Sequence, residues 1–289
     1  MLKAFRSKHV FEKGLPTLYT RNYKILHTQP SFFNKEVVVS QKGSWRKLSF
    51  GDAPSYGGTL LQGHLKIKDE ALVHSSRCDY INTMICSALS FMASKYGVEK
   101  FLDDREFLFI GLGIGCSPTF FANLNHPSLS LDVIEIDPIV IDVAEKYFEF
   151  PRNKMRNVYA QDLAEYLKRD DKSSYDVVFL DIYTQYGLPT HLFGEDTLSH
   201  IANVVKSTGI LIANVHCPEV ERYVEICENF AKIFDNIRTV ACEVDYTNNI
   251  MVCSNTLFDP QDVTEAAQRL DEEYKFDVGV KHVMFGLEL

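Results

Sequence analysis

The sequence lacks the patterns that mark several common classes of protein. Its 289 residues contain no apolar run near the roughly 18 residues that a membrane-spanning helix needs. Its seven cysteines form no CxxC pair and no metal-ligand spacing, and most lie in apolar segments, which indicates reduced thiols in a cytosol-like compartment. No GxxxxGK[ST] phosphate loop occurs, which argues against a nucleoside triphosphatase. These absences favour a soluble, cytoplasmic protein without a metal site.

Charge is distributed unevenly along the chain. Positions 1–47 hold ten Lys or Arg against two Glu, whereas the remainder holds 20 basic and 37 acidic residues. The acidic main region disfavours nucleic acid as a ligand and suits a cationic or amine substrate. The basic arm is interpreted as a solvated terminus. A mitochondrial targeting peptide and a contact with an acidic partner or nucleic acid are the alternatives.

Short β-like segments fill the first quarter of the chain. They predict a small antiparallel region, in which turn residues at 54–58 separate neighbouring segments. We therefore divide the chain into 1–75, a basic arm with this β region, and 76–289, the main domain. The expected strands are Val37–Val39, Lys47–Phe50, Thr59–Leu61 and Leu65–Ile67.

The pattern then changes to strands that alternate with helical segments. Asp79–Tyr96 has apolar residues at three- and four-residue spacing, which predicts an amphipathic helix with Asp79 as its N-cap. Near-continuous apolar strands between helices predict a parallel sheet covered on both faces, in an α/β fold. The expected strands are 107–111, 131–137, 158–162, 176–182 and 210–215, followed by a hairpin of 237–244 with 250–253 and a helix at 261–275.

Three glycines at alternate positions follow the first of these strands: Gly111, Gly113 and Gly115. In a doubly wound sheet, ligands bind outside the carboxyl ends of the strands, and glycine lets a ligand approach the main chain closely. The loop GLGIGCSP therefore predicts a binding site. It departs from the dinucleotide fingerprint GxGxxG, because the sixth position is Cys116 and Pro118 follows, and this disfavours NAD.

Carboxylates end the next two strands. Glu135 is assigned to the hydroxyls of a ribose, with a solvated strand end as the alternative. Asp137 and Pro138 after it are typical of a helix start. Asp162 either accepts a hydrogen bond from an adenine amine or caps the helix that begins at Leu163. Together these features indicate a nucleoside held without a phosphate clamp, such as S-adenosylmethionine (SAM).

The run GLGIGCSP…VIEIDP…AQDLAEYL…YDVVFLDIY resembles the spermidine-synthase-like branch of the class I SAM-dependent methyltransferases, from about Asp69 to Ser254. It is most similar to the C-terminal domain of the eukaryotic enzymes that methylate the N-terminus of elongation factor 1-alpha. The resemblance implies a Rossmann-like seven-stranded fold with a small N-terminal β-rich region, and it is compatible with a homodimer. The cofactor would contact Gly111, Gly113, Gly115, Glu135, Asp162 and Asp181.

The resembling family uses two chemistries, and this chain departs from one of them. Aminopropyltransferases carry G-G-x-D-G-G in the loop and D-[ST]-[ST]-D after the fourth strand. Here the loop position is Ile114, and the second Asp is replaced by Thr184. A dicationic diamine would lose a carboxylate partner, whereas the carboxylate of intact SAM would lose a repulsive charge. Both departures favour methyl transfer over aminopropyl transfer.

The catalytic candidates lie after the fourth strand. Asp181 is expected to orient an amine acceptor and take its proton, with a turn-capping or cofactor-contacting Asp as the alternative. Tyr183, Tyr186 and His191 occupy a surface loop over the site, where an aromatic wall suits a cationic group, although ordinary packing is the stronger expectation for each. Asn214, at the end of the next strand, also faces the predicted pocket.

Two other reactive side chains receive structural interpretations. Cys116 has no base near it in the sequence and is expected to be a packing residue, and His126 is expected to lie in a turn.

The leading hypothesis is a SAM-dependent methyltransferase that modifies an amine, with a protein lysine or N-terminus ahead of a small molecule. Two alternatives remain open. The first is an aminopropyltransferase of polyamine biosynthesis that uses decarboxylated SAM. The second is a catalytically silent member that acts as a binding protein.

Overall fold

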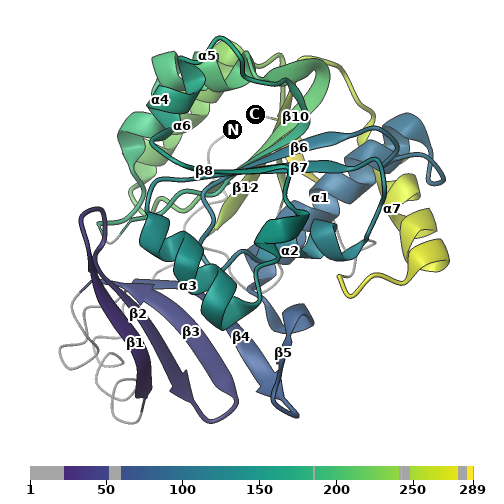
Figure 1. The fold of residues 1–289 in the computed structure, drawn as a ribbon. Coiled ribbons are helices and arrows are strands. Elements are labelled where there is room, and N and C mark those ends of the chain that lie inside the picture. Colours follow the sequence, from purple (N-terminus) through teal and green to yellow (C-terminus); the bar gives the residue numbers. More distant parts are fainter. Residues whose placement is uncertain are drawn as a thin grey trace, which may run out of the picture.

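The computed structural model describes residues 23–51, 60–184, 186–240, 242, 248–278 and 285–288. Within these ranges, a small antiparallel sheet lies beside a larger sheet that has helices on both faces (Figure 1). The basic arm before residue 23, the turn at 54–58 and most of the loop between the predicted hairpin strands lie outside the described residues.

The small sheet confirms the antiparallel region predicted near the N-terminus. Its strands pair in sequence order, each antiparallel to the next. Two strands were not predicted: the first, because its sequence KILHTQPS has no apolar alternation, and the last, because it is only three residues long. The strands are β1 (Lys24–Ser31), β2 (Lys35–Lys42), β3 (Trp45–Phe50), β4 (Leu60–Lys68) and β5 (Ala71–Val73).

Strand β4 corrects one prediction. Segments 59–61 and 65–67 were expected to be separate strands, but β4 runs without a break from Leu60 to Lys68, and Thr59 lies outside the described residues. Leu48 pairs with Gly63 and Ser49 with Leu61, so one extra residue forms a bulge between them. A Cβ at Gly63 would lie 2.9 Å from the side chain of Ile114. The glycine therefore permits a close approach of the loop at 111–118 and does not end the strand.

The large sheet contains the predicted parallel strands. Its order is β8-β7-β6-β9-β10-β12-β11-β13, in which the pairs from β8 to β10 are parallel and the remaining pairs antiparallel. The predicted seven strands are confirmed, and β13 adds an eighth at the edge. The strands are β6 (Glu106–Ile110), β7 (Ser130–Glu135), β8 (Asn157–Ala160), β9 (Tyr175–Leu180), β10 (Val205–Val215), β11 (Asn236–Val240), β12 (Asn249–Ser254) and β13 (Phe285–Glu288).

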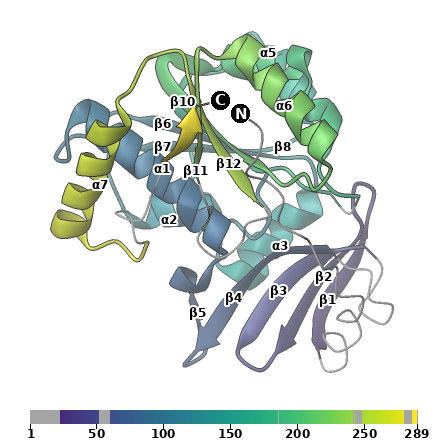
Figure 2. The same ribbon diagram turned by 180° about the vertical axis from the view of Figure 1, so that it is seen from behind.

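Helices cover both faces of the large sheet, which makes three layers (Figures 1 and 2). One buried apolar cluster joins the sheet to α1, α2, α3, α7 and the small sheet, and a second joins its other face to α4, α5 and α6. The helices are α1 (Asp79–Tyr96), α2 (Cys116–Asn123), α3 (Pro138–Phe148), α4 (Leu163–Leu167), α5 (Glu195–Ala202), α6 (Val220–Ile233) and α7 (Pro260–Tyr274).

The helix starts were predicted with one error. Asp137 caps α3 by accepting a hydrogen bond from the Ile139 amide at 3.0 Å, as predicted. Asp79 is not the N-cap of α1, because Cys78 occupies that position. Asp79 is instead the first helical residue, where its charge favours the positive end of the helix. The proposed domain boundary at 75/76 falls in a 3-10 turn, His74–Ser76, between β5 and α1, and it remains a prediction.

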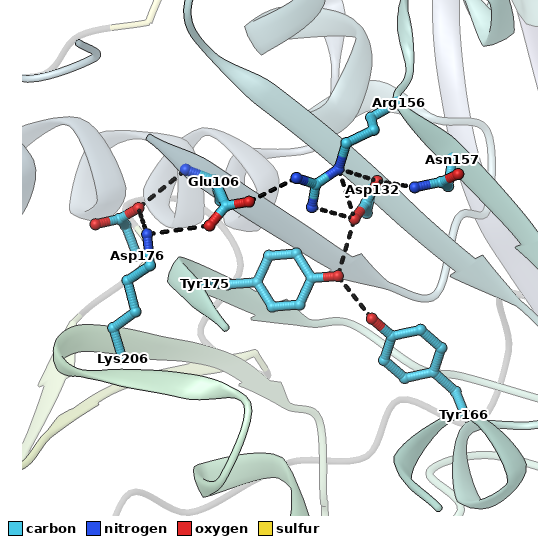
Figure 3. A network of polar contacts seen from close by, with 8 residues as sticks. All are labelled: Glu106, Asp132, Arg156, Asn157, Tyr166, Tyr175, Asp176 and Lys206. Atoms are coloured by element: carbon cyan, nitrogen blue, oxygen red, sulfur yellow. Dashed lines mark hydrogen bonds and ion pairs between the residues drawn. The ribbon is translucent and has the colours of Figure 1, made fainter. Parts of the chain in front are cut away.

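A network of charged and phenolic side chains closes the amino ends of the parallel strands (Figure 3). Arg156 donates to both carboxylate oxygens of Asp132 and to Glu106, and Lys206 contacts Glu106 and Asp176. Tyr175 donates to Asp132 at 2.9 Å, and the Tyr166 and Tyr175 hydroxyls lie 2.6 Å apart. Every charge in this network has a partner of opposite sign.

Candidate functional site

A cavity lies at the carboxyl ends of β6, β7 and β9, on either side of the point where the strand order reverses. Residues from six segments line it. They include Phe33 and Asn34 in the turn after β1, Tyr80 and Met84 in α1, the glycine loop at 111–114 and 116–118, Glu135, Gln161 with Asp162, and Asp181–Thr184 with His191.

The glycine loop is shaped by its close contact with β9. Gly111 has a φ of +90°, and a Cβ there would lie 2.2 Å from the carbonyl oxygen of Asp181. Gly113 also has a positive φ, and both residues line the cavity. Gly115 is the left-handed N-cap of α2 and packs against Phe150, outside the cavity lining. The structure therefore gives Gly115 a conformational task, and its contact with a ligand remains a prediction.

Glu135 lies at the end of β7, beside the glycine loop. Its carboxylate accepts hydrogen bonds from the Leu112 amide at 2.9 Å and the Asp137 amide at 3.0 Å. Burial raises the pKa of Glu135 to about 7, although the backbone donors partly offset this. The Ile136 amide is a third backbone donor, and because a carboxylate has about four acceptor positions, acceptor capacity remains for a ligand. The alternative of a solvated strand end does not fit, because Glu135 is only 9% exposed.

Asp162 caps α4, as one of the two interpretations expected. Its Oδ1 accepts a hydrogen bond from the Ala164 amide at 2.7 Å, and the residue also lines the cavity. Next to it, Gln161 has a buried Nε2 with no hydrogen-bond partner among the described residues. An unpaired buried donor is costly, so this amide is positioned for an acceptor on a ligand.

Asp181 is the centre of a polar group that the sequence revealed only in part. Asn214 donates to Asp181 Oδ1 at 3.0 Å, and Tyr80 forms a second side-chain hydrogen bond with this carboxylate. Burial raises the pKa of Asp181, and these two donors partly offset that shift. No cation among the described residues pairs with it. Asn214 does not line the cavity, but its Oδ1 is buried and without a partner in the described part of the chain.

Sequence reasoning missed Tyr80 because its spacing in α1 matches an ordinary apolar position. Asn34 was also missed, since it belongs to the turn after the unpredicted strand β1. This turn is fixed by Asp137, whose Oδ2 accepts hydrogen bonds from Asn34 Nδ2 at 2.9 Å and from the Ser31 hydroxyl. In the sequence, the signal that points to this contact is the carboxylate of Asp137, which directly precedes α3.

The two positions that depart from the aminopropyltransferase pattern have defined environments. Ile114 is 3% exposed and packs against Gly63 of β4. The Thr184 hydroxyl donates to the Gly187 carbonyl at 3.0 Å, within a tight turn. Both residues line the cavity. Neither gives the cavity a negative charge.

The loop after β9 places its candidates differently. Tyr183 lines the cavity, and its ring meets that of His216 edge-on at 5.5 Å. Burial raises the pKa of Tyr183. His191 also lines the cavity, whereas Tyr186 is 81% exposed at the tip of the loop. His216 was not anticipated, since it follows the end of β10.

Cys116 and His126, which were expected to be a packing residue and a turn residue, have those positions in the structure. Burial raises the pKa of Cys116 to about 12, which keeps it a neutral thiol at the cavity wall. His126 lies in the turn before β7, with its Nε2 at 3.2 Å from a carboxylate oxygen of Asp103. All seven cysteines are free.

The described residues offer neither a metal site nor a membrane span. They contain no group of three His, Cys, Asp or Glu side chains that could hold a metal ion. In the same ranges, no helix is long and apolar enough to cross a membrane.

The fold and the position of the cavity define a Rossmann-like protein with a cavity at the switch point of its parallel strands. A family model described as the spermine/spermidine synthase domain matches residues 98–261, which is more than half of the chain. The chain therefore belongs to the spermine/spermidine synthase domain family, and the resemblance noted in its motifs is confirmed.

Similar proteins include both aminopropyltransferases and methyltransferases. The chain is 36% identical over 112 residues to a polyamine aminopropyltransferase of Vibrio vulnificus, covering 38% of this chain and 37% of that protein. It is 27% identical over 186 residues to the eEF1A lysine and N-terminal methyltransferase homolog of Drosophila melanogaster, covering 61% of this chain and 26% of that protein. The chain thus spans well under half of either relative.

Solved structures confirm the fold. Human methyltransferase-like protein 13 in complex with SAH matches with a TM-score of 0.60 at 22% identity, covering 68% of this chain and 91% of that one. Spermidine synthase from Thermotoga maritima also gives a TM-score of 0.60, at 19% identity, covering 89% of this chain and 83% of that one. At these identities, the likeness concerns the fold alone.

Proposed function

We propose that this chain is a SAM-dependent methyltransferase that acts on an amine, with a polypeptide lysine or N-terminus as the preferred acceptor. The observation that carries the proposal is the absence of negative charge at two cavity positions, Ile114 and Thr184. Aminopropyltransferases are expected to hold carboxylates there. The similarity to eEF1A lysine and N-terminal methyltransferases supports the same conclusion.

The cavity residues fit SAM. The carboxylate of Glu135 has free acceptor positions for ribose hydroxyls, and the unpaired Gln161 Nε2 and the Asp162 carboxylate can meet an adenine edge. The apolar side chain of Ile114 presents no repulsive charge to the methionine carboxylate. When bound, SAM supplies an activated methyl group on a sulfonium.

The chain's own contribution is to hold the acceptor in line and to remove its proton. Positioning alone supplies roughly 7–11 kcal/mol in well-oriented reactions. Asp181 is the proposed base, because it lies in the cavity, has a raised pKa and has no cation as a partner. Its hydrogen bonds with Tyr80 and Asn214 fix its orientation. Tyr183 provides an aromatic wall for the cationic centre.

Aminopropyl transfer from decarboxylated SAM is the second candidate. It is favoured by the match to the Vibrio vulnificus aminopropyltransferase and by the retained Asp181. Against it, Thr184 is engaged with Gly187, so a diamine would find one carboxylate at this end of the cavity. A catalytically silent binding protein is the third. A reducing cytoplasmic location is part of the proposal and is supported by the seven free thiols.

The deciding experiment compares the binding of SAM and decarboxylated SAM by calorimetry. We expect SAM to bind and the decarboxylated form to bind at least about tenfold more weakly, since only SAM has a carboxylate for the uncharged loop. A reversed preference would identify an aminopropyltransferase. Binding of neither would point to the silent alternative. Transfer of labelled methyl groups to purified eEF1A and to putrescine then separates a protein acceptor from a small one.

A further inference from the structure

Exposed apolar side chains occur in the loop after β9 and at the start of α6. Tyr186 is 81% exposed at the tip of the loop after β9, and Val220 and Val224 in α6 are 70% and 48% exposed. The opposite face of α6 is buried against the sheet through Ile226 and Phe230. The two valines therefore belong to the outward face of the helix, one turn apart.

Helix α6 begins four residues after His216, which contacts a residue of the cavity lining. Strand β10 ends at Val215, and the next residue, His216, touches the ring of Tyr183, which lines the cavity. Further along α6, Asn229 donates to the Phe193 carbonyl at 3.2 Å, which fixes the helix to the turn that carries His191. Figure 2 shows α6 beside α5 on the flank away from α7.

The same face carries acidic side chains. Glu221, Glu225 and Glu228 are exposed, and none forms an ion pair within the described ranges, whereas Glu219 lies 3.6 Å from Arg222. We call Tyr186, Val220, Glu221, Val224 and Glu225 the mouth surface. It combines apolar contact area with negative charge, so it complements a segment that is both apolar and basic.

We propose that the mouth surface docks the polypeptide acceptor, as a segment in which lysine or arginine side chains alternate with apolar ones. This proposal rests on the proposed function and specifies its acceptor. The target amine of the segment enters the cavity toward Asp181, whose neighbour Asn214 has a buried Oδ1 without a partner. A small amine that fits the cavity needs none of the mouth surface, and nucleic acid would be repelled by Glu221 and Glu225.

The test uses 12-residue peptides with a free N-terminus and a fluorescein at the C-terminus, measured by anisotropy. One alternates Lys and Leu, the second Lys and Ser, and the third Glu and Leu. We expect the Lys/Leu peptide to bind best, the Lys/Ser peptide several-fold more weakly and the Glu/Leu peptide not at all. Equal binding of the Lys/Leu and Lys/Ser peptides would overturn the apolar part of the proposal.

Two variants locate the binding. E221K/E225K should weaken Lys/Leu binding at least tenfold, and V220S/V224S about fivefold. The matched control E265K/E272K changes two exposed acids on α7, which lies on the opposite flank, and should leave binding unchanged (Figure 1). If both charge reversals weaken binding equally, the peptide is held by overall charge, and the mouth surface is not a docking site.

Calorimetry of SAM on the same proteins separates the two proposals. SAM binding that is unchanged in all variants, together with unselective peptide binding, overturns the docking surface alone. Selective peptide binding without any SAM binding overturns the proposed methyltransferase and leaves the docking surface standing. If E221K/E225K instead dissociates a dimer seen by sedimentation, a second copy occupies the mouth surface and the proposal is wrong.

Discussion

The two ends of the large sheet carry similar residues in opposite electrostatic states. At the amino ends, Asp132 and Asp176 are buried and each meets a basic side chain (Figure 3). At the carboxyl ends, Glu135 and Asp181 are held by amides and a phenol, without a cation among the described residues.

Burial acts on all four carboxylates, but only at the amino ends is its cost offset by a partner of opposite charge. At the carboxyl ends no cation among the described residues offsets the cost of burying the charge, and burial raises the pKa of both Glu135 and Asp181. Unpaired buried carboxylates are typical of sites that a cation or a hydrogen-bond donor later fills. The contrast therefore distinguishes the carboxyl ends of the strands, which carry the candidate site, from the amino ends, whose ion pairs stabilise the fold.

The largest effect is expected from D181N. Loss of the proposed base should lower methyl transfer by about 10²–10⁴-fold, measured as kcat with SAM and a protein acceptor. Thermal unfolding should show equal or higher stability, because the variant removes a buried charge that has no cation partner. D181N with full turnover would remove Asp181 from the mechanism.

D132N should show the opposite pattern at the other end of the sheet. Arg156 and Tyr175 both lose a charged partner, and breaking a buried pair typically costs about 3 kcal/mol in unfolding free energy. Urea unfolding measures this loss. SAM affinity, measured by calorimetry, should be unchanged, and a loss of affinity without a loss of stability would contradict the division of roles between the two ends.

Glu135 should make stability depend on pH. Its pKa is about 7 in the folded chain and about 4.3 when unfolded, so the folded state binds the extra proton between these values. The contribution of Glu135 to stability is therefore fully present below pH 4.3 and is lost as pH rises to 7, by up to about 3 kcal/mol. Asp181 acts in the same direction, so urea unfolding of wild type and E135Q at pH 5 and pH 8 isolates the difference.

The same group should couple protons to the cofactor. Ribose hydroxyls donate to an ionised carboxylate, so SAM affinity should rise as pH increases through about 7, with proton release on binding at pH 6. Calorimetry in two buffers with different ionisation enthalpies measures that release. An affinity that is flat from pH 6 to 8 would show that Glu135 does not hold the ribose.

The smallest effect concerns Gly63 and Ile114. In G63A the new methyl group would collide with Ile114, displace the cofactor loop and weaken SAM binding by about tenfold. The double variant G63A/I114A should recover most of that affinity, because the collision is removed. I114A alone is the control. If G63A binds SAM normally, contact with β4 does not set the position of the loop.

Much of the candidate site at the carboxyl ends of the strands could be predicted from the sequence, because hydrophobic periodicity shows where each strand ends. The parallel strands, the loop at Gly111 and the carboxylates Glu135 and Asp181 followed from that rule. Tyr80 and Asn34 could not be found in this way, since they reach the cavity from α1 and from the small sheet. Their position depends on how these elements pack. The continuity of β4 through Gly63 could not be predicted either, because the side chain that this glycine accommodates, Ile114, lies 51 positions further along the chain.

The turn after β1 affects the order in which the newly made chain completes its cavity. Ser31 and Asn34 bond to Asp137 across 106 and 103 positions of sequence, and this contact completes the cavity wall at Asn34. During synthesis at about 5–20 residues per second, the turn after β1 emerges roughly 5–20 s before Asp137. Closure of the wall is therefore a late, non-local step in folding. Cofactor binding would then report on completed assembly of the newly made chain and not on formation of the large sheet alone.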